Sequence, residues 1–233
     1  MNKTKIEWCD YTINPVKGLC PMACSYCYAR AMYKRFKWDE TIRLDAAAIQ
    51  EIHSIKEPSR IFVGSTIELF GDWIEPEWYD YIWGMVKAKP QHTFIFLTKY
   101  SSGLAKFSPF PKNCWVGVSA TDEGQFLVGW HRLKDIQATV KFFSLEPLLK
   151  PILISKETLE QAGINWLIVG QQTPTSIKTS PKIEWIEEIC QAATSSNIPV
   201  FLKNNLKPLY KEHYGMTQIR QEFPVSPSGV EEK

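Results

Sequence analysis

The chain has 233 residues, of which 44% are apolar and 22% charged, and its formal net charge is +2 at pH 7. This length and balance predict one globular domain with a sizeable core. The longest apolar runs fall far short of the roughly 20 residues that a membrane span requires, and the polar first ten residues show no signal peptide. We therefore expect a cytoplasmic protein with no membrane partner. The net charge is too small to indicate a nucleic-acid partner through the field of the whole protein, and it does not exclude one.

Three cysteines lie close together near the amino terminus. Cys20, Cys24 and Cys27 form a Cys-x3-Cys-x2-Cys pattern within eight residues, and Tyr26 precedes the last of them. Three thiolates this close converge on one point, which suits an iron–sulfur cluster or a zinc ion. A tetranuclear cluster held by three cysteines keeps one iron free for a ligand from outside the protein. The remaining cysteines are interpreted as packing residues, namely Cys9, Cys114 and Cys190.

Further along the chain, short runs rich in β-branched and aromatic residues alternate with amphipathic segments, which is the pattern of repeated βα units around a parallel sheet. The predicted strands are 12–14, 60–65, 93–98, 114–119, 140–145, 165–170 and 199–203. The predicted helices are 27–36, 46–55, 77–88, 122–136, 156–162 and 183–195. These strands are too few for an eightfold barrel. We therefore predict an α/β fold, a partial (β/α)6-type TIM barrel of parallel strands, in a single domain of residues 1–217. Residues 218–233 form a polar C-terminal tail and are a candidate for disorder.

Polar residues follow nearly every predicted strand. In βα barrels, side chains at the carboxyl ends of the strands line the active site, so these residues are the candidates for function. Each of them alone is equally well explained as a helix cap or a loop residue, and Asp122 is the plainest such case. The set comprises Ser65, Thr66, Glu68, Thr98, Lys99, Ser119, Thr121, Asp122, Ser144, Glu146, Gln171, Gln172, Lys203, Asn204 and Asn205.

Short motifs accompany the cysteines along most of the chain. They are Ile6-Glu7-Trp8, Thr12-Ile13-Asn14-Pro15-Val16, Tyr28-Ala29-Arg30, Ile61-Phe62-Val63-Gly64-Ser65, Leu97-Thr98-Lys99 and Glu146-Pro147-Leu148-Leu149. Over roughly residues 5 to 205 this pattern resembles the phage-associated three-cysteine family catalogued as domain-of-unknown-function family 5131. The cysteine spacing with its aromatic residue resembles the signature of radical S-adenosylmethionine (SAM) enzymes. The chain departs from the family at Cys9 and at the run Gly170-Gln171-Gln172-Thr173.

The resemblance implies a radical SAM enzyme with a three-quarter barrel, in which the three cysteines hold a [4Fe–4S] cluster and SAM binds its open iron. Residues implied or favoured as SAM contacts are Tyr26, Gly64, Ser65, Thr66, Glu68, Ser119, Ser144 and Gln171. Residues expected to address the substrate are Lys99, Glu146 and Lys203. For the two lysines, a salt bridge at a strand end is the alternative. An electron donor such as flavodoxin or ferredoxin is implied. The substrate is unidentified, with a nucleic-acid base or nucleotide as the first expectation, and a large substrate needs an open barrel side or a partner protein.

Two other classes of protein fit the sequence. One is a zinc-binding module in which Cys9 or His92 is the fourth ligand. The other is a barrel that keeps its cluster and serves as a binding or electron-transfer subunit of a phage-associated complex. The basic residues Lys34, Arg35 and Lys37 after the cysteine motif suit either phosphate contacts or a solvated helix face.

Overall fold

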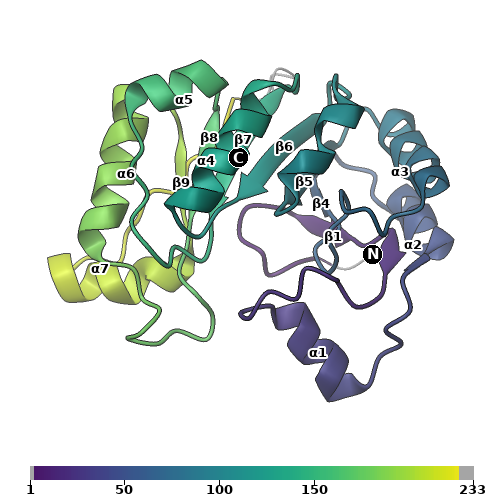
Figure 1. Ribbon diagram of the computed structural model, residues 1–233, viewed down its shortest axis with the longest axis horizontal. Helices are drawn as coiled ribbons and strands as arrows, with labels where there is room; N and C mark the ends of the chain where they lie inside the picture. Colours follow the sequence, from purple (N-terminus) through teal and green to yellow (C-terminus); the bar gives the residue numbers. More distant parts are fainter. Residues whose placement is uncertain (1–2, 226–233) are drawn as a thin grey trace. The chain divides into compact units, whose positions relative to one another are not determined.

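A computed structural model describes residues 3–225 of the chain (Figure 1). The chain divides into two compact units, which we describe separately. Unit 1 comprises Met1–Ser119 with Asp135–Thr139, and unit 2 comprises Ala120–Lys134 with Val140–Lys233. Seven strands form the main sheet in the order β1-β4-β5-β6-β7-β8-β9, which is their order along the chain. No helix among residues 3–225 is both long and apolar enough to cross a membrane.

Unit 1 holds the first four strands of this sheet, which are β1 (Tyr11–Ile13), β4 (Arg60–Val63), β5 (Thr93–Thr98) and β6 (Cys114–Ser119). Each pairs in parallel with the next. Its helices are α1 (Tyr28–Phe36), α2 (Ala46–Gln50) and α3 (Pro76–Ala88), with 3-10 turns at Glu51–Ser54, Ser101–Gly103 and Ala105–Phe107. A small antiparallel pair, β2 (Val16–Lys17) and β3 (Arg43–Leu44), joins the segment before α1 to the segment after it.

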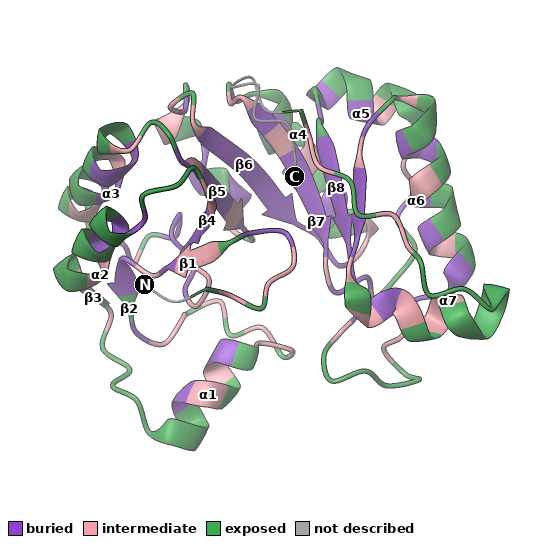
Figure 2. Ribbon diagram, turned by 180° about the vertical axis from the view of Figure 1, so that it is seen from behind, coloured by how far each residue is buried: buried purple, intermediate pink, exposed green. Residues whose placement is uncertain are grey.

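The strands of unit 1 are buried because both faces of a parallel sheet are covered. Phe94, Ile95 and Val116 in β5 and β6 are fully buried, and so is Val86 of α3. Figure 2 shows these strands as buried and the outer face of α3 as exposed. Pro76 stands in the first turn of α3, where its missing N–H costs nothing. The continuous apolar runs recognised in the sequence therefore form the core.

Unit 2 holds β7 (Val140–Leu145), β8 (Trp166–Val169) and β9 (Val200–Leu202), again paired in parallel. Its helices are α4 (Glu123–Lys134), α5 (Lys156–Ala162), α6 (Ile183–Ser195) and α7 (Lys207–Tyr214), with a 3-10 turn at Asn204–Leu206. Ser155 caps α5 by accepting a hydrogen bond from the Thr158 N–H, and Gly163 ends that helix with a positive φ of 63°. Ile186 and Ile189 of α6 are fully buried, as is Trp166.

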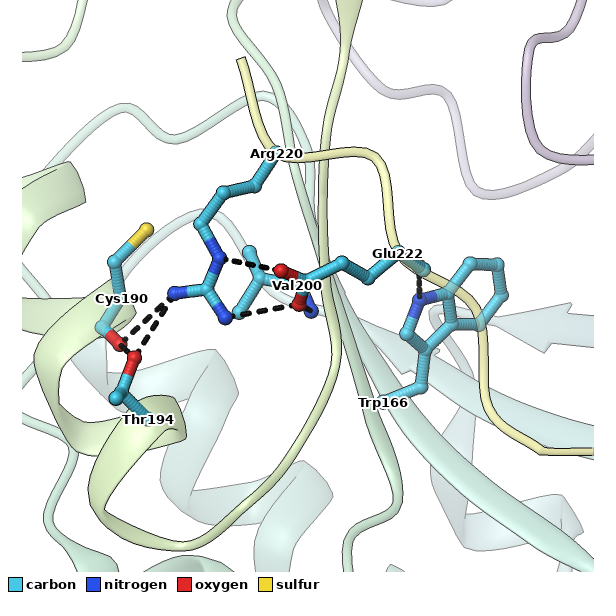
Figure 3. Close-up of polar contacts among 6 residues, drawn as sticks. All are labelled: Trp166, Cys190, Thr194, Val200, Arg220 and Glu222. Carbon is cyan, nitrogen blue, oxygen red and sulfur yellow. Dashed lines mark hydrogen bonds and ion pairs between the residues drawn. The ribbon is translucent and has the colours of Figure 1, made fainter.

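The predicted strands and helices are all present, with boundaries shifted by two residues at most except at the predicted helix 46–55. There α2 ends at Gln50, and the 3-10 turn Glu51–Ser54 continues it. The pair β2–β3 and helix α7 were not predicted. The expectation of disorder after residue 217 is wrong for residues 220–223, which pack along β9 (Figure 3). Gln221 forms an antiparallel bridge with Phe201, and the Phe223 ring lies 5.2 Å from the Phe201 ring. Residues 226–233 of the predicted tail lie outside the described residues. The single domain of residues 1–217 stays a prediction.

Candidate metal centre

The loop that carries the three cysteines is fixed at its start. Gly18 has a φ of +130°, and a Cβ there would lie 2.6 Å from the Ile42 Cα. Its N–H donates to the Tyr33 hydroxyl at 2.9 Å, and the Leu19 N–H donates to the Glu40 carbonyl at 2.9 Å. A side chain at position 18 would therefore displace the loop from the residues on which it rests.

Cys27 is the N-cap of α1. Its Sγ accepts a hydrogen bond from the Arg30 N–H at 3.5 Å, and the Arg30 guanidinium donates to the Cys20 carbonyl at 2.6 Å. One residue of α1 thus holds both ends of the cysteine loop.

Cys20 is held from the other side by the segment after β4. The Glu68 N–H donates to the Cys20 Sγ at 3.5 Å. Burial raises the pKa of the Cys20 thiol, while the N–H groups of Glu68 and Met22 act in the opposite direction, and nearby Cys27 raises it further. Cys20, Cys24 and Cys27 are free thiols of intermediate exposure.

The chemistry of this donor set fits an iron–sulfur cluster. Three unpaired, partly exposed thiols share one loop, and two of them accept backbone N–H groups of the kind that tune thiolate ligands. The expected convergence of the three cysteine side chains on one point is not seen in this structure, because no three His, Cys, Asp or Glu side chains within residues 3–225 are gathered as they are around a metal ion. Cys9 and His92 are buried and precede β1 and β5, whereas Cys20 contacts Glu68 beyond the carboxyl end of β4. These positions do not support Cys9 or His92 as a fourth ligand.

The Glu68 carboxylate is buried, with the residue 8% exposed, and it accepts three internal hydrogen bonds. They come from the Thr98 hydroxyl at 2.7 Å, the Lys99 N–H at 2.7 Å and the Phe70 N–H at 3.0 Å. These bonds tie the segment after β4 to the end of β5. Glu68 was predicted to contact SAM, and in the structure its carboxylate is already occupied by these donors.

Asn14 organises the other predicted residues after β4. Its Oδ1 accepts from the Ser65 hydroxyl at 3.2 Å, the Thr66 N–H at 3.2 Å and the Thr66 hydroxyl at 3.1 Å. The preceding Gly64 has a φ of +80°, and a Cβ there would lie 2.4 Å from the Leu69 Cδ1. The Tyr28 hydroxyl donates to the Ser65 carbonyl at 2.9 Å. Asn14 is absent from the predicted site residues. Its place directly after β1, at a strand end like the others, was the signal that could have identified it.

Lys99 connects the end of β5 to the cysteine loop. Its Nζ lies 5.8 Å from the centre of the Tyr26 ring, within the range of a cation–π contact. Direct contacts in unit 1 therefore link the cysteine loop, which includes Tyr26, to Ser65, Glu68 and Lys99. Gly64 and Thr66 flank Ser65 in the same segment after β4. Ser119 is buried at the end of β6, the fourth strand of the same unit.

The other predicted site residues belong to unit 2. The Lys203 ammonium donates to the Glu146 carboxylate, so Lys203 forms the strand-end salt bridge that was the alternative to a catalytic role. Gly170 leaves room for this pair, since a Cβ there would lie 3.2 Å from the Glu146 carboxyl carbon. Gln171 is surrounded by hydrogen bonds. It both donates hydrogen bonds to Asn205 and accepts one from it, and its side-chain oxygen accepts a hydrogen bond from the Ser180 hydroxyl at 3.0 Å. The fully buried Ser144 Oγ has no hydrogen-bond partner among the described residues.

Residues 3–217 match the family described as Protein of unknown function (DUF5131). The chain belongs to this family. A search of curated proteins finds no match. Among solved structures, this DUF5131 protein is similar to a spore photoproduct lyase double mutant with bound AdoMet and dinucleoside spore photoproduct. The sequence identity is 13% and the TM-score 0.50, over 84% of this chain and 64% of the lyase chain. The DUF5131 chain thus spans less than two thirds of the lyase. At this identity the likeness concerns the fold, and it confirms the predicted α/β partial barrel with a parallel sheet.

Proposed function

We propose that this DUF5131 protein is a radical SAM enzyme whose cluster is held by Cys20, Cys24 and Cys27. The observation that carries the proposal is the attachment of the cysteine loop to the carboxyl end of the parallel strands of unit 1, through the hydrogen bond from Glu68 to Cys20. That edge is where βα folds bind ligands. The likeness to a lyase structure with bound AdoMet supports the same reading.

When bound, the reduced cluster and SAM would supply an electron and a carbon radical able to remove hydrogen from a C–H bond. The residues of this chain bind and orient. The N–H groups of Arg30 and Glu68 position the Cys27 and Cys20 sulfurs. Asn14 holds the hydroxyls of Ser65 and Thr66 in place, and we propose that these hydroxyls and the neighbouring backbone receive the polar groups of SAM.

Two further parts of the proposal concern what reacts with the enzyme. The chemistry needs a one-electron donor, for which flavodoxin or ferredoxin is suitable. We propose a nucleic-acid base or nucleotide as the substrate, because the similar lyase structure holds a dinucleoside. The roles predicted for Ser119, Ser144, Glu146, Gln171 and Lys203 stay predictions.

The proposal is tested by anaerobic reconstitution with iron and sulfide, followed by dithionite reduction with SAM and chromatography for 5′-deoxyadenosine. Iron content and cluster absorbance are measured on the same samples. We expect about four irons per chain and 5′-deoxyadenosine from the unaltered protein, and neither from the Cys20→Ala, Cys24→Ala, Cys27→Ala triple variant.

Cys190→Ala is the matched thiol control, because Cys190 lies on α6 in unit 2. It should keep the iron and the activity. Zinc in place of iron, or loss of the cluster in the control but not in the triple variant, would contradict the assignment. A full cluster without 5′-deoxyadenosine, with or without added oligonucleotide, would favour a binding or electron-transfer subunit.

A further inference from the structure

The carboxyl end of α1 and the two residues after it present basic and aromatic side chains to solvent. Lys34, Arg35, Phe36, Lys37 and Trp38 are all exposed, and we call these five residues the α1 patch. Phe36 is 52% exposed and Trp38 is 43% exposed, which is unusual for large rings. In both views of the molecule α1 lies away from α2 and α3 of its own unit (Figures 1 and 2).

The two rings of the patch are held in place although they are exposed. Lys37 ends α1 with a left-handed backbone, φ 51°, which turns the chain so that Trp38 returns toward the helix. The Trp38 ring lies 5.5 Å from Phe36, nearly parallel to it, and meets Tyr33 edge-on at 5.3 Å. Tyr33 itself is buried. The rings therefore form a preorganised surface.

The charges of the patch are not compensated locally. Residues 28–38 contain four basic residues and no acidic one. The Arg35 guanidinium lies 5.2 Å from the Phe36 ring centre. Asp39, the next acid along the chain, pairs with Arg43 at 2.8 Å. Within the described part of the chain, no ion pair engages Lys34, Arg35 or Lys37.

Exposed rings beside uncompensated cations match a ligand that carries both flat bases and phosphates. We propose that the α1 patch binds single-stranded nucleic acid, with bases on Phe36 and Trp38 and phosphates on Lys34, Arg35 and Lys37. Six helical residues, 28–33, separate Cys27 from Lys34, so the patch begins about 10 Å along α1 from Cys27. The patch thus holds nucleotides flanking the one that reacts. Only this last statement, that the bound strand carries the substrate, rests on the proposed function.

The test is the fluorescence anisotropy of labelled oligothymidylate and oligouridylate of 12 nucleotides, titrated with the full chain at 50 and 200 mM salt. We expect saturable binding that weakens with salt, because phosphate contacts release counterions. Phe36→Ala with Trp38→Ala should weaken binding about 10-fold or more, and so should Lys34→Gln with Arg35→Gln. The two oligonucleotides distinguish DNA from RNA.

Tyr81→Ala with Lys87→Gln is the matched control, because both residues are exposed on α3 of the same unit. It should bind like the unaltered chain, and thermal melts verify that every variant folds. Absence of binding, or binding that the patch variants leave unchanged, would overturn the proposal, as would a flavodoxin that competes for the patch while no oligonucleotide binds. Oligonucleotide binding without 5′-deoxyadenosine formation would instead refute the proposed function alone.

Discussion

Glu68 serves the candidate site through both its backbone and its side chain. Its N–H holds the Cys20 sulfur, and its carboxylate holds the Thr98 hydroxyl and the Lys99 N–H. The three donors replace the hydrogen bonds to water that the carboxylate loses when it is buried. Glu68 is thus a positioning residue. Because its own backbone N–H contacts the Cys20 sulfur, a change in the Glu68 side chain is expected to displace the cysteine loop as well.

Replacing Glu68 by Gln tests this role. The amide NH2 group would face a donor, so one buried N–H or hydroxyl would lose its acceptor at a cost of about 1–3 kcal/mol. We expect a Tm lower by several degrees and a lower iron content after reconstitution, measured by calorimetry and iron assay. Glu77→Gln, at an exposed position in the first turn of α3, should change neither. Equal behaviour of the two variants would refute the positioning role.

Asn14 offers a second test at the scale of one side chain. Asn14→Ala removes the shared acceptor of Ser65 and Thr66, and we expect a loss of stability of about 1–2 kcal/mol together with weaker SAM binding by the reconstituted protein. Urea melts and titration calorimetry measure the two effects.

The control is Asn113→Ala, because the Asn113 side chain also bonds backbone groups, the carbonyls of Val86 and Lys89, but stands before β6 rather than after a strand. It should lose comparable stability and keep its SAM affinity. If both variants bind SAM equally well, Asn14 does not shape the cofactor site.

At the scale of secondary-structure elements, the segment 220–223 depends on one ion pair, shown in Figure 3. Arg220 bonds both oxygens of Glu222, at 3.0 and 2.9 Å, and also the Thr194 hydroxyl at 3.0 Å. Glu222 in turn accepts the Val200 N–H at 3.0 Å, and its carbonyl accepts the Trp166 ring N–H at 2.8 Å. The segment is thereby joined to α6, β8 and β9.

This pair makes stability depend on pH. Arg220 beside Glu222 lowers the pKa of that carboxyl. Its contribution is therefore present above the ordinary glutamate pKa and is lost as the pH falls through the lowered value. Because both side chains are partly exposed, we expect only about 1 kcal/mol for Glu222→Gln at pH 7. The difference in stability between Glu222→Gln and the unaltered chain should shrink below about pH 4 in urea melts. A constant difference across this pH range would contradict the assignment.

The sequence predicted the elements well because the signals of parallel strands are local. β5 and β6 are continuous apolar runs, and Asp45 and Ser155 stand where helices need a cap. The pair β2–β3 is too short for a periodic pattern. The segment 220–223 is polar except for Phe223, and its pairing with β9 uses backbone groups that no side chain reveals.

For the site, the strand-end rule pointed to Ser65, Glu68 and Lys99, which contact the cysteine loop directly, while their functional roles stay predictions. It did not find their partners, because bonds such as Ser65 to Asn14 or Glu68 to Thr98 join residues 51 and 30 positions apart. Whether a carboxylate is open to a ligand or occupied internally depends on such long-range contacts. That is why Glu68 resembles a cofactor ligand in the sequence and a structural acceptor in the fold.

At the scale of the whole molecule, both outer strands of the parallel sheet carry an antiparallel bridge. Lys3 bridges to Tyr11 of β1, and Gln221 bridges to Phe201 of β9. Open edges of sheets are templates for pairing between molecules. Short antiparallel segments near the two ends of the described chain therefore protect the edges of the sheet.

Truncation tests this protection. Removing residues 218–233 would uncover the backbone of β9 and the rings of Trp166 and Phe201, so we expect a lower Tm and concentration-dependent oligomers in size-exclusion chromatography with light scattering. Removing residues 226–233 keeps every described contact of the segment and should leave a species like the full chain. A monomeric, equally stable product from the longer truncation would show that β9 needs no cover.

The order of the strands bears on how the protein is made. Because each strand pairs with the strand before it in the main sheet, every new strand finds its partner already synthesised as the chain leaves the ribosome. The three cysteines, Glu68 and the residues that bind its carboxylate all precede β6. If the three cysteines hold the proposed cluster, iron and sulfide would therefore meet a complete cysteine loop and its supports while most of unit 2 is still being translated.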